Sequence, residues 1–419
     1  MPEVLNLKSK IENALPAELA SLMKAAGKLA CEQGQGLYLV GGVVRDLMLG
    51  QKNFDLDLVV EGDAIRLAEK LSKIKKGKLS IYPHFGTAKL EWKEWSVDLA
   101  TARSETYAKP GALPSTKPST LAQDLSRRDF TINTMAIHLD PSRFGELIDL
   151  HSGRDDLENK IIRVLHERSF IDDATRIWRG IRYEKRLDFR LEENTLKLLK
   201  QDIPMLDTIS DDRIRYELEC VFKEESPEKA LRRAEELGVL AKLHPALRAT
   251  SWLAQKFKAA RKFSHPDLPS FELYLAILTY PLTSKEKEEL ISYLNLPKSI
   301  AKTLRDSTNI KSELVALAKA ELKPSRIYRI LHGYAPAAVQ ANLLATDSQL
   351  AGENIQLFLN KLRYVKPALS GKDLIRTGIP SGPRIKEILE QLLEARLDGK
   401  VTTRKDEEDL VKRWLVGRR

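Results

Sequence analysis

The stretch LYLVGGVVRDLMLGQKNFDLDLVV occupies residues 37–60 and decides the fold of the first half of the chain. Four apolar residues typical of a strand lead into Gly41 and Gly42, and a helix-like segment that contains Arg45 follows. Backbone N–H groups at such a turn can bind a phosphate, and an arginine about one helical turn later can point its guanidinium at the same anion. The pattern is typical of a triphosphate site and, equally, of a plain strand-to-helix turn.

Asp55 and Asp57 lie two residues apart in the apolar segment FDLDLVV. Because side chains alternate between the faces of a strand, both carboxylates are predicted to project to the same side. Two carboxylates on one face repel each other unless a cation lies between them, and Mg²⁺ is the cation that bridges protein carboxylates and substrate phosphates. The pair therefore predicts a magnesium site beside the double-glycine turn. The alternative is a pair of exposed polar positions on an edge strand.

The sequence as far as about Val164 alternates short apolar segments with turns and helices. Strands are predicted for LYLV, FDLDLVV, LSIY, TAKLEW, SVDLA and TINTMAIHL. A helix is predicted for AIRLAEKLSKI, and the segment KPGALPSTKPST at 109–120 is predicted to be a mobile loop. This half is therefore expected to be a mixed α/β domain with one sheet.

From Asp172 onward the pattern changes to long helical segments such as DDATRIWRGIRYEKRL and PRIKEILEQLLEARL. Several of them begin with Ser, Asp or Pro, which are residues suited to helix starts. The second half is predicted to be almost entirely α-helical, so the fold class of the chain is α+β.

The charge balance favours a phosphate-rich partner. Lysine and arginine number 69 and aspartate and glutamate 59, which gives a formal net charge of +10. Cys31 and Cys220 are far apart and show no zinc-ligand spacing, so neither a disulfide framework nor a structural zinc site is expected. The amphipathic N-terminus does not resemble a signal peptide and no apolar segment is long enough to span a membrane, so we expect a cytoplasmic protein.

The segment DDATRIWRGIR carries Asp173, Arg176, Arg179 and Arg182 at intervals of three residues. On a helix these residues form a ridge that drifts slowly round one side. Such a ridge fits either a solvated face or the wall of an anion site.

A double-glycine turn followed by a DxD strand is the signature of the nucleotidyltransferase superfamily, and residues 37–60 closely resemble the class II tRNA nucleotidyltransferase and bacterial poly(A) polymerase family. Later segments resemble that family's further motifs in the same order: LSRRDFTINTMAI, IDLHSGRDDLENKIIRVL, DDATRIWRGIRYEKRLDF and DDRIRYEL. The resemblance implies a polymerase β-like, mixed-sheet nucleotidyltransferase head at 1–165. It also implies a helical neck with a nucleobase-selecting motif at 166–240 and a helical body and tail that bind tRNA at 241–419.

The resemblance also implies roles for individual residues of the head. Asp55 and Asp57 would be the catalytic residues and would bind two Mg²⁺ ions. The nucleotide would be contacted by Gly41, Gly42, Arg45, Arg128 and Asn133. Asp129 would brace the site, and Asp98 is a candidate third carboxylate by analogy with other polymerases, unless it is a structural acid paired with Arg103.

In the neck, the resemblance implies that Asp173 and Arg176 read the nucleobase. Cytosine and adenine each present an amino donor beside a ring-nitrogen acceptor, which one carboxylate and one guanidinium can pair. Guanine and uracil present the reverse arrangement and would be rejected at about 1–3 kcal/mol per unpaired polar group. Arg179 and Arg182 would face the triphosphate or help to set this protein template.

The implied reaction is template-independent addition of CMP, AMP or both from CTP and ATP to the 3′ end of tRNA, with release of pyrophosphate. The expected partner is tRNA, held by its acceptor and T arms, and the oligomeric state is not predicted. Within the family the alternatives are a CC-only enzyme, an A-only enzyme and a poly(A) polymerase. Outside enzymes, the alternative is a noncatalytic RNA-binding clamp.

Overall fold

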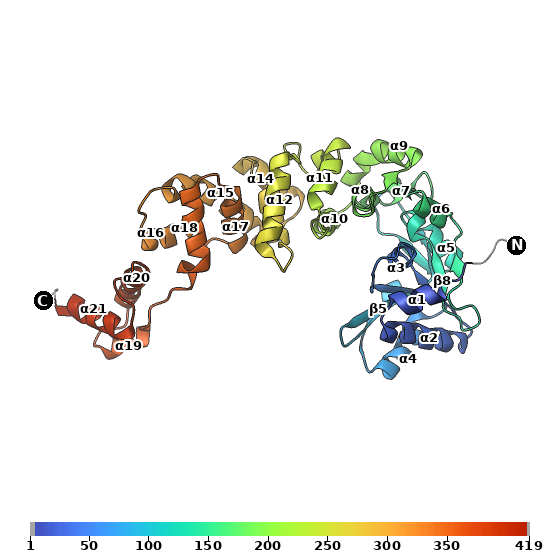
Figure 1. Ribbon diagram of the computed structural model, residues 1–419, viewed down its shortest axis with the longest axis horizontal. Coiled ribbons are helices and arrows are strands. Elements are labelled where there is room, and N and C mark those ends of the chain that lie inside the picture. Colours follow the sequence, from blue (N-terminus) through green and yellow to red (C-terminus); the bar gives the residue numbers. More distant parts are fainter. Residues whose placement is uncertain (1–4, 417–419) are drawn as a thin grey trace. The chain divides into compact units, whose positions relative to one another are not determined.

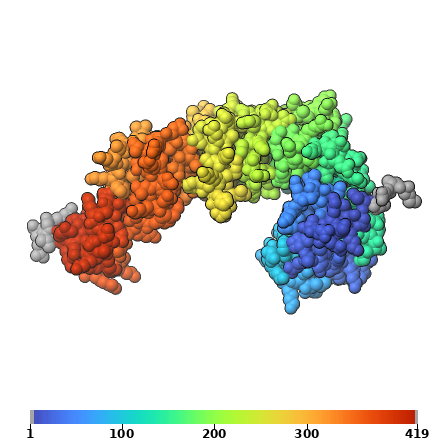
Figure 2. Space-filling model, in the orientation of Figure 1, coloured from blue at the N-terminus to red at the C-terminus, as the bar shows by residue number. Residues whose placement is uncertain are grey.

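The computed structural model describes residues 5–416, and the chain divides into two compact units. The first unit contains the chain up to Ser226 together with Glu236–Lys242, and the second contains Pro227–Glu235 and the chain from Leu243 onward. The first unit starts at the blue end of the colour scale and the second extends to the red end (Figures 1 and 2). The domain boundaries at residues 165 and 240 remain a prediction.

A seven-stranded mixed sheet in the order β3-β4-β5-β2-β1-β8-β9 forms the centre of the first unit. Only β2 and β5 pair in parallel, and every other neighbouring pair in this sheet is antiparallel. The strands are β1 Gly36–Val40, β2 Leu56–Glu61, β3 Lys78–Tyr82, β4 Thr87–Trp92, β5 Trp95–Thr101, β8 Ala136–His138 and β9 Leu147–Ile148. The mixed-sheet head and the α+β class are confirmed.

The two faces of this sheet are covered differently. Helices α2 (Ala17–Cys31) and α4 (Ala64–Lys75) pack on the inner face, where side chains such as Leu39, Leu90 and Leu99 are fully buried (Figure 1). On the outer face, α5 (Leu121–Ser126) covers β1 and β2 through a small apolar cluster. The outer side chains of β3, β4 and β5 remain accessible, and this uncovered half borders the site described below.

Two of the expected elements differ in the structure. The segment TINTMAIHL begins with a 3₁₀ turn, η2 (Thr131–Asn133), and only Ala136–His138 form a strand. The backbone N–H of Thr131 donates to the carbonyl of Arg163, which directs this segment away from the sheet. The predicted loop at 109–120 contains β7 (Ser115–Pro118), which pairs with β6 (Arg103–Thr106) as a two-stranded ribbon. Pro118 lies at the end of an edge strand, where a missing N–H is tolerated.

The rest of the first unit is mainly helical. α8 (Thr175–Leu187) packs against α10 (Asp211–Phe222), and the two-residue strands β10 (Ile161–Ile162) and β11 (Arg190–Leu191) pair in parallel beside them. The remaining helices here are α1 Lys8–Ala14, α3 Gly42–Met48, α6 Gly153–Glu158, α7 Ser169–Asp172 and α9 Glu193–Asp202, with 3₁₀ turns η1 Pro83–Phe85, η3 Ile203–Thr208 and η4 Leu240–Lys242.

The described residues of the second unit form helices joined by loops, without strands, as predicted. Its helices are α11 Pro227–Glu236 (Glu236 itself belongs to the first unit), α12 Ser251–Ser264, α13 Phe271–Leu278, α14 Ser284–Tyr293, α15 Lys298–Leu317, α16 Pro324–Leu331, α17 Pro336–Ala345, α18 Gln349–Asn360, α19 Gly371–Arg376, α20 Pro383–Leu397 and α21 Arg404–Val416, with the 3₁₀ turn η5 Leu362–Tyr364. One apolar core joins α15 to α18, and a smaller one joins α19 to α21. Between residues 5 and 416, no helix has the length and apolar character needed to cross a membrane.

Candidate active site

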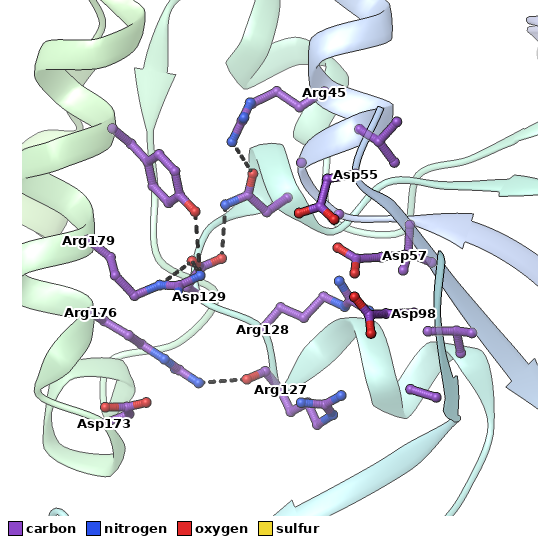
Figure 3. Close-up of a pocket in the computed structure, with 18 of the residues that line it drawn as sticks. Arg45, Asp55, Asp57, Asp98, Arg127, Arg128, Asp129, Asp173, Arg176 and Arg179 are labelled. Atoms are coloured by element: carbon purple, nitrogen blue, oxygen red, sulfur yellow. Dashed lines mark hydrogen bonds and ion pairs between the residues drawn. The ribbon is translucent and has the colours of Figure 1, made fainter. Parts of the chain in front are cut away.

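Three carboxylates form one wall of a cavity of about 620 Å³ in the first unit. Asp57 of β2 lies directly opposite Asp98 of β5 in the parallel register, so both side chains project from the same face of the sheet. Asp55 precedes β2 by one residue, which corrects the prediction that it belongs to the strand; its backbone N–H donates to Asn53 Oδ1 at 2.9 Å. Figure 3 shows the three carboxylates stacked beside one another at the edge of the cavity.

The carboxylate of Asp57 is the most perturbed of the three. Burial, followed by the negative charges of Asp55 and Asp98, raises its pKa to about 6, although Arg128 acts in the opposite direction. The partner of Asp98 is Lys89 at 3.5 Å, so the predicted alternative of a pair with Arg103 is wrong. The acidic wall therefore carries more negative charge than its protein neighbours neutralise.

The double-glycine turn places the backbone beside these carboxylates. Gly41 has a φ of +80°, which only glycine adopts without strain, and α3 begins at the next residue. A Cβ atom at Gly41 would lie 3.3 Å from Arg128 Nη1 and 3.4 Å from Asp57 Oδ2, so the turn fits tightly between a guanidinium and a carboxylate. Glycine is required here both by conformation and by space.

Asp124, in the middle of α5, orients Arg127 and Arg128. This fully buried carboxylate accepts hydrogen bonds from Arg127 Nη2 at 2.6 Å and from Arg128 Nη2 at 2.9 Å. Burial raises the pKa of Asp124, but the charges of Arg128 and Arg127 outweigh it and the net shift is downward. Sequence analysis missed Asp124, although its position three and four residues before the two arginines on a helical turn is a recognisable signal.

A chain of hydrogen bonds links the head to α8. Arg45 Nη1 donates to Asn133 Oδ1 at 2.8 Å, and Asn133 Nδ2 donates to Asp129 Oδ1 at 3.0 Å. The other oxygen of Asp129 accepts two bonds from Arg179, at 2.9 Å from Nε and 2.5 Å from Nη2 (Figure 3). Burial alone would raise the pKa of Asp129, yet Arg179 and Asn133 lower it to about 2. Asp129 therefore stays ionised and connects two arginines that line the cavity, Arg179 directly and Arg45 through Asn133.

Tyr183 of α8 is the second feature that the sequence did not reveal. Four guanidinium groups lie within 6 Å of its ring centroid: Arg182 at 5.0 Å, Arg45 at 5.2 Å, Arg186 at 5.8 Å and Arg179 at 5.9 Å. The negative face of an aromatic ring attracts such cations and so reduces the cost of gathering them. The wall opposite the carboxylates is therefore strongly basic.

Asp173 and Arg176, the predicted base-reading pair, lie at the start of α8 but not within a single helix. Asp173 follows the last residue of α7, and its Oδ1 accepts from Thr175 N, from Thr175 Oγ1 and from Arg213 Nη2 at 2.7 Å. The continuous ridge that begins at Asp173 is thus corrected, because the extended backbone of Asp173 interrupts it. Arg176 is 5% exposed and donates to Ser169 Oγ at 2.7 Å and to the carbonyl of Arg127 at 2.6 Å.

The cavity brings ten of the eleven predicted site residues together. Its lining includes Gly41, Gly42, Arg45, Asp55, Asp57, Arg128, Asn133, Asp173, Arg176 and Arg179. Arg182 does not belong to the lining, since it pairs with Glu217 at 3.8 Å and Glu224 at 3.4 Å. Its proposed contact with the nucleotide therefore has no support from the geometry.

The donor set of the acidic wall suits a divalent cation. Carboxylate oxygens are the ligands that Mg²⁺ prefers, and Mg²⁺ normally combines one or two of them with substrate phosphates and water. Within residues 5–416 no group of three or more His, Cys, Asp or Glu side chains is arranged to hold a metal ion. Burial, followed by the charge of Asp55, raises the pKa of Asp57, and a bound cation would counteract both effects.

Two family models match the chain, and the site lies in and beside the first. Residues 37–163 match the poly A polymerase head domain, and residues 188–250 match the probable RNA and SrmB-binding site of polymerase A. The carboxylates, the double-glycine turn and the arginine pair all lie inside the first match. The cavity is therefore that of a nucleotidyltransferase head.

Relatives along the whole chain narrow this class. The A-adding tRNA nucleotidyltransferase of Geobacter sulfurreducens is 35% identical over 94% of this chain and 47% of its own length, and that of Halalkalibacterium halodurans is 32% identical over 92% and 90%. The Thermotoga maritima CCA-adding enzyme complexed with tRNA_CCA superposes with a TM-score of 0.74 at 32% identity, covering 99% of this chain and all of that one. The chain belongs to the tRNA nucleotidyltransferase family.

The relatives differ in length and in the nucleotides that their names specify. This chain spans about half of the Geobacter relative but nine tenths of the Halalkalibacterium relative. Among the curated relatives, five named CC-adding or CCA-adding are 27–30% identical to this chain and three named A-adding are 32–36% identical, while solved structures of CCA-adding enzymes are 32–33% identical. Family membership alone therefore does not identify which nucleotides this chain adds.

Proposed function

We propose that this chain transfers AMP from ATP to the 3′ end of a tRNA that already ends in CC. The observation that carries the transfer reaction is the cavity itself, in which Asp55, Asp57 and Asp98 face a wall of arginines. The choice of AMP is supported by the higher identity to A-adding relatives. Addition of the complete CCA sequence is the second candidate, because the solved structures of this fold at 32–33% identity include CCA-adding enzymes with ATP and with CTP.

In the proposed reaction the RNA 3′-oxygen attacks the α-phosphorus of ATP. A bond forms between that oxygen and phosphorus, the bond to the β-phosphate oxygen breaks, the hydroxyl proton is lost and pyrophosphate leaves. Two Mg²⁺ ions held by Asp55 and Asp57 would activate the hydroxyl and stabilise charge on the leaving oxygens. Arg45, Arg128 and Arg179 neutralise the triphosphate from the opposite side.

Base selection would depend on Asp173 and Arg176. Since Asp173 Oδ1 already accepts three hydrogen bonds, Oδ2 is the oxygen available to an amino group of adenine or cytosine. Arg176 has two of its nitrogens bound to Ser169 and to the Arg127 carbonyl, so Nε and the second hydrogen of Nη2 are available to the ring nitrogen. The protein edge thus presents an acceptor beside a donor, which adenine and cytosine match and guanine does not.

The test is incorporation of labelled ATP and CTP, separately and together, into three tRNA transcripts that end at the discriminator base, at C and at CC. An A-adding enzyme extends only the CC-ended transcript, by one A, and ignores CTP. Ordered addition of C, C and A would support the second candidate. Addition of CC alone, or synthesis of long A tails, would contradict both.

The catalytic assignment needs a separate control. Replacement of both Asp55 and Asp57 by Asn should abolish incorporation and leave RNA affinity unchanged, and omission of Mg²⁺ should have the same effect on the wild type. An unchanged function after both replacements would identify a noncatalytic RNA-binding clamp and overturn the enzyme assignment.

A further inference from the structure

The outer face of β3, β4 and β5 continues the sheet surface that carries the catalytic carboxylates. Its strands pair in a fixed register, in which Asp57 lies opposite Asp98, Asp98 opposite Lys89, and Lys89 opposite Ser80. These four residues form one row across four strands, with about 4.8 Å between neighbours. A straight path therefore leads from the predicted metal site onto the uncovered half of the sheet.

The next row ends in an exposed aromatic residue. Ala100 lies opposite Thr87, and Thr87 lies opposite Tyr82, whose side chain projects to the same face as Lys89 and Ser80. Tyr82 is 52% exposed, and Phe85 in the adjoining turn η1 is 51% exposed. The carbonyl of Phe85 accepts a hydrogen bond from Arg103 Nη1 at 3.4 Å, and Arg103 lines the cavity. The aromatic turn is thus attached to the rim of the active site.

Most of the residues proposed to contact the nucleotide lie on the other side of the catalytic carboxylates. Arg45 of α3 and Arg176 and Arg179 of α8 lie across the cavity from Asp98, while Arg128 extends toward Asp57 and Asp98 (Figure 3). A 3′-hydroxyl that attacks the α-phosphorus in line must approach from the side opposite the leaving pyrophosphate. The uncovered strands β5, β4 and β3 provide that approach.

We propose that the outer face of β3, β4 and β5 binds the unpaired 3′ end of the RNA acceptor strand. Lys89 contacts the backbone phosphate next to the reacting hydroxyl, and Tyr82 stacks on a base one or two nucleotides further back. The assignment of RNA as the occupant rests on the proposed function above. It also rests on the combination of one cation and exposed aromatic rings on a sheet, which is how single strands are bound without base readout.

The pair of Lys89 and Asp98 acquires a function in this arrangement. In the free protein Lys89 Nζ lies 3.5 Å from Asp98 Oδ2, and both side chains remain partly exposed. When Asp98 turns to a cation bound at the acidic wall, Lys89 loses its partner and can bind an RNA phosphate instead. The exchange keeps the local charge balanced as metal and RNA arrive.

The test compares RNA binding and ATP binding in matched variants. Tyr82→Ala removes the ring on which one base stacks, so the KM for CC-ended tRNA should rise about tenfold. The KM for ATP and the kcat at saturating RNA should stay within twofold of wild type, and Tyr82→Phe should behave as wild type. Ile81→Ala is the control, because Ile81 is exposed on the same strand but belongs to the opposite face.

Lys89 is tested by the salt dependence of RNA affinity. Each phosphate contact to a single strand contributes about 0.7 to the slope of log K against log salt, so Lys89→Gln should lower the slope by about that amount. Lys73→Gln is the control. Lys73 lies on α4, which packs on the opposite face of the sheet, so this variant should leave the slope of log K against log salt unchanged.

The position of the stacked base is tested with RNAs that lack the base either one or two nucleotides before the 3′-terminal nucleotide. If Tyr82 stacks there, Tyr82→Ala should weaken binding of intact RNA but have no further effect on one of the abasic RNAs. An RNA KM within twofold of wild type for Tyr82→Ala, an equal rise for Ile81→Ala, or the same loss on both abasic RNAs would overturn the proposal. Turnover by the wild type is measured alongside: its absence would refute the proposed function, while the RNA affinities still decide where the strand binds.

Discussion

The two walls of the cavity carry opposite charges and are held in opposite ways. On the basic wall nearly every arginine has a protein partner: Arg179 binds Asp129, Arg128 binds Asp124, and Arg186 binds Glu224 at 2.8 Å. On the acidic wall the carboxylates of Asp55 and Asp57 face each other and Asp98, and the pKa of Asp57 rises to about 6. The arginines are thus fixed before the nucleotide arrives, whereas the carboxylates are left short of positive charge.

This difference separates two kinds of preorganisation. A fixed guanidinium array stabilises a triphosphate without reorganisation at the moment of reaction. A group of under-neutralised carboxylates instead stores a repulsion that a cation relieves, so that metal binding and folding become linked. Loss of a basic-wall residue should therefore damage both stability and activity, whereas loss of an acidic-wall residue should damage activity alone.

The largest effect is expected for Asp57→Asn. If Asp57 is a metal ligand as proposed, the variant loses several kcal/mol of transition-state stabilisation, so kcat should fall by about 10³-fold or more. Its free energy of unfolding at pH 7.5 should not decrease, because a repulsive charge is removed. Single-turnover incorporation and urea unfolding measure the two quantities. Glu94→Gln, at the exposed β4–β5 turn, is the control, and retention of a tenth of the activity by Asp57→Asn would contradict the assignment.

Asp129→Asn should lower both the stability of the protein and its activity. The substitution leaves the Arg179 charge uncompensated, at a cost of about 3 kcal/mol in unfolding free energy, the lower end of the usual range because the Arg179 side chain is 34% exposed. Activity should fall about 10²-fold, since Arg179 and Asn133 both lose their anchor. Urea unfolding measures the loss of stability, and incorporation assays at increasing ATP concentration measure the loss of activity.

A double-mutant cycle shows whether the two residues act as one unit. If Arg179→Met is combined with Asp129→Asn, the losses of stability should be clearly less than additive. Full additivity would mean that the ion pair does not organise the basic wall.

Arg213→Met should reduce the discrimination of ATP from GTP. Arg213 Nη2 holds Oδ1 of Asp173 at 2.7 Å, and a hydrogen bond between charged groups contributes about 1.5–3 kcal/mol, so a loss of about tenfold in the ratio of kcat/KM values is expected. Arg213→Lys should lie between the variant and wild type, because it keeps the charge but not the planar geometry. Arg215→Met is the control, since Arg215 pairs with Asp212 at 2.6 Å. An unchanged ratio together with a lowered melting temperature would mean a purely structural residue.

The acidic wall was largely predictable from sequence and the organisation of the basic wall was not. Asp57 and the double-glycine turn follow from local periodicity and turn chemistry, because β1 and β2 are apolar strands that pair with each other. The anchoring of Arg45 depends on Asn133, which is 88 positions away, and on the Tyr183 ring, and such contacts leave no periodic signal.

Two errors in the predicted local structure also arise from contacts that the sequence pattern does not reveal. The segment TINTMAIHL has the alternation of a strand, but the tertiary bond from Thr131 N to the Arg163 carbonyl turns its first half. Asp173 fits a helical ridge by spacing, yet its backbone is extended and its carboxylate accepts a hydrogen bond from Thr175 N two residues later, so Asp173 lies before the helix and not in it.

The smallest and most diagnostic effect concerns the stability of the acidic wall as pH changes. Asp57 has a folded-state pKa of about 6, above the value of about 3.9 for an unfolded chain. Protonated Asp57 therefore favours the folded state. This contribution to stability is fully present below the unfolded-state pKa and is lost as pH rises through the folded-state pKa. Between pH 5 and pH 7.5, with chelator present, wild type should lose about 1–2 kcal/mol relative to Asp57→Asn after allowance for solvent screening, which corresponds to a few degrees in Tm.

Added Mg²⁺ should restore the stability lost at pH 7.5 in wild type but not in Asp57→Asn. A cation that binds the folded state stabilises it by mass action, so Mg²⁺ at pH 7.5 should raise the Tm of wild type and leave that of Asp57→Asn almost unchanged. Thermal unfolding followed by circular dichroism at both pH values, with chelator and with Mg²⁺, measures all four combinations. An equal rise for both proteins would mean that Mg²⁺ acts elsewhere on the chain, and the contrast between an anchored basic wall and an under-neutralised acidic wall would fail, because the repulsion at Asp57 would not be what the cation relieves.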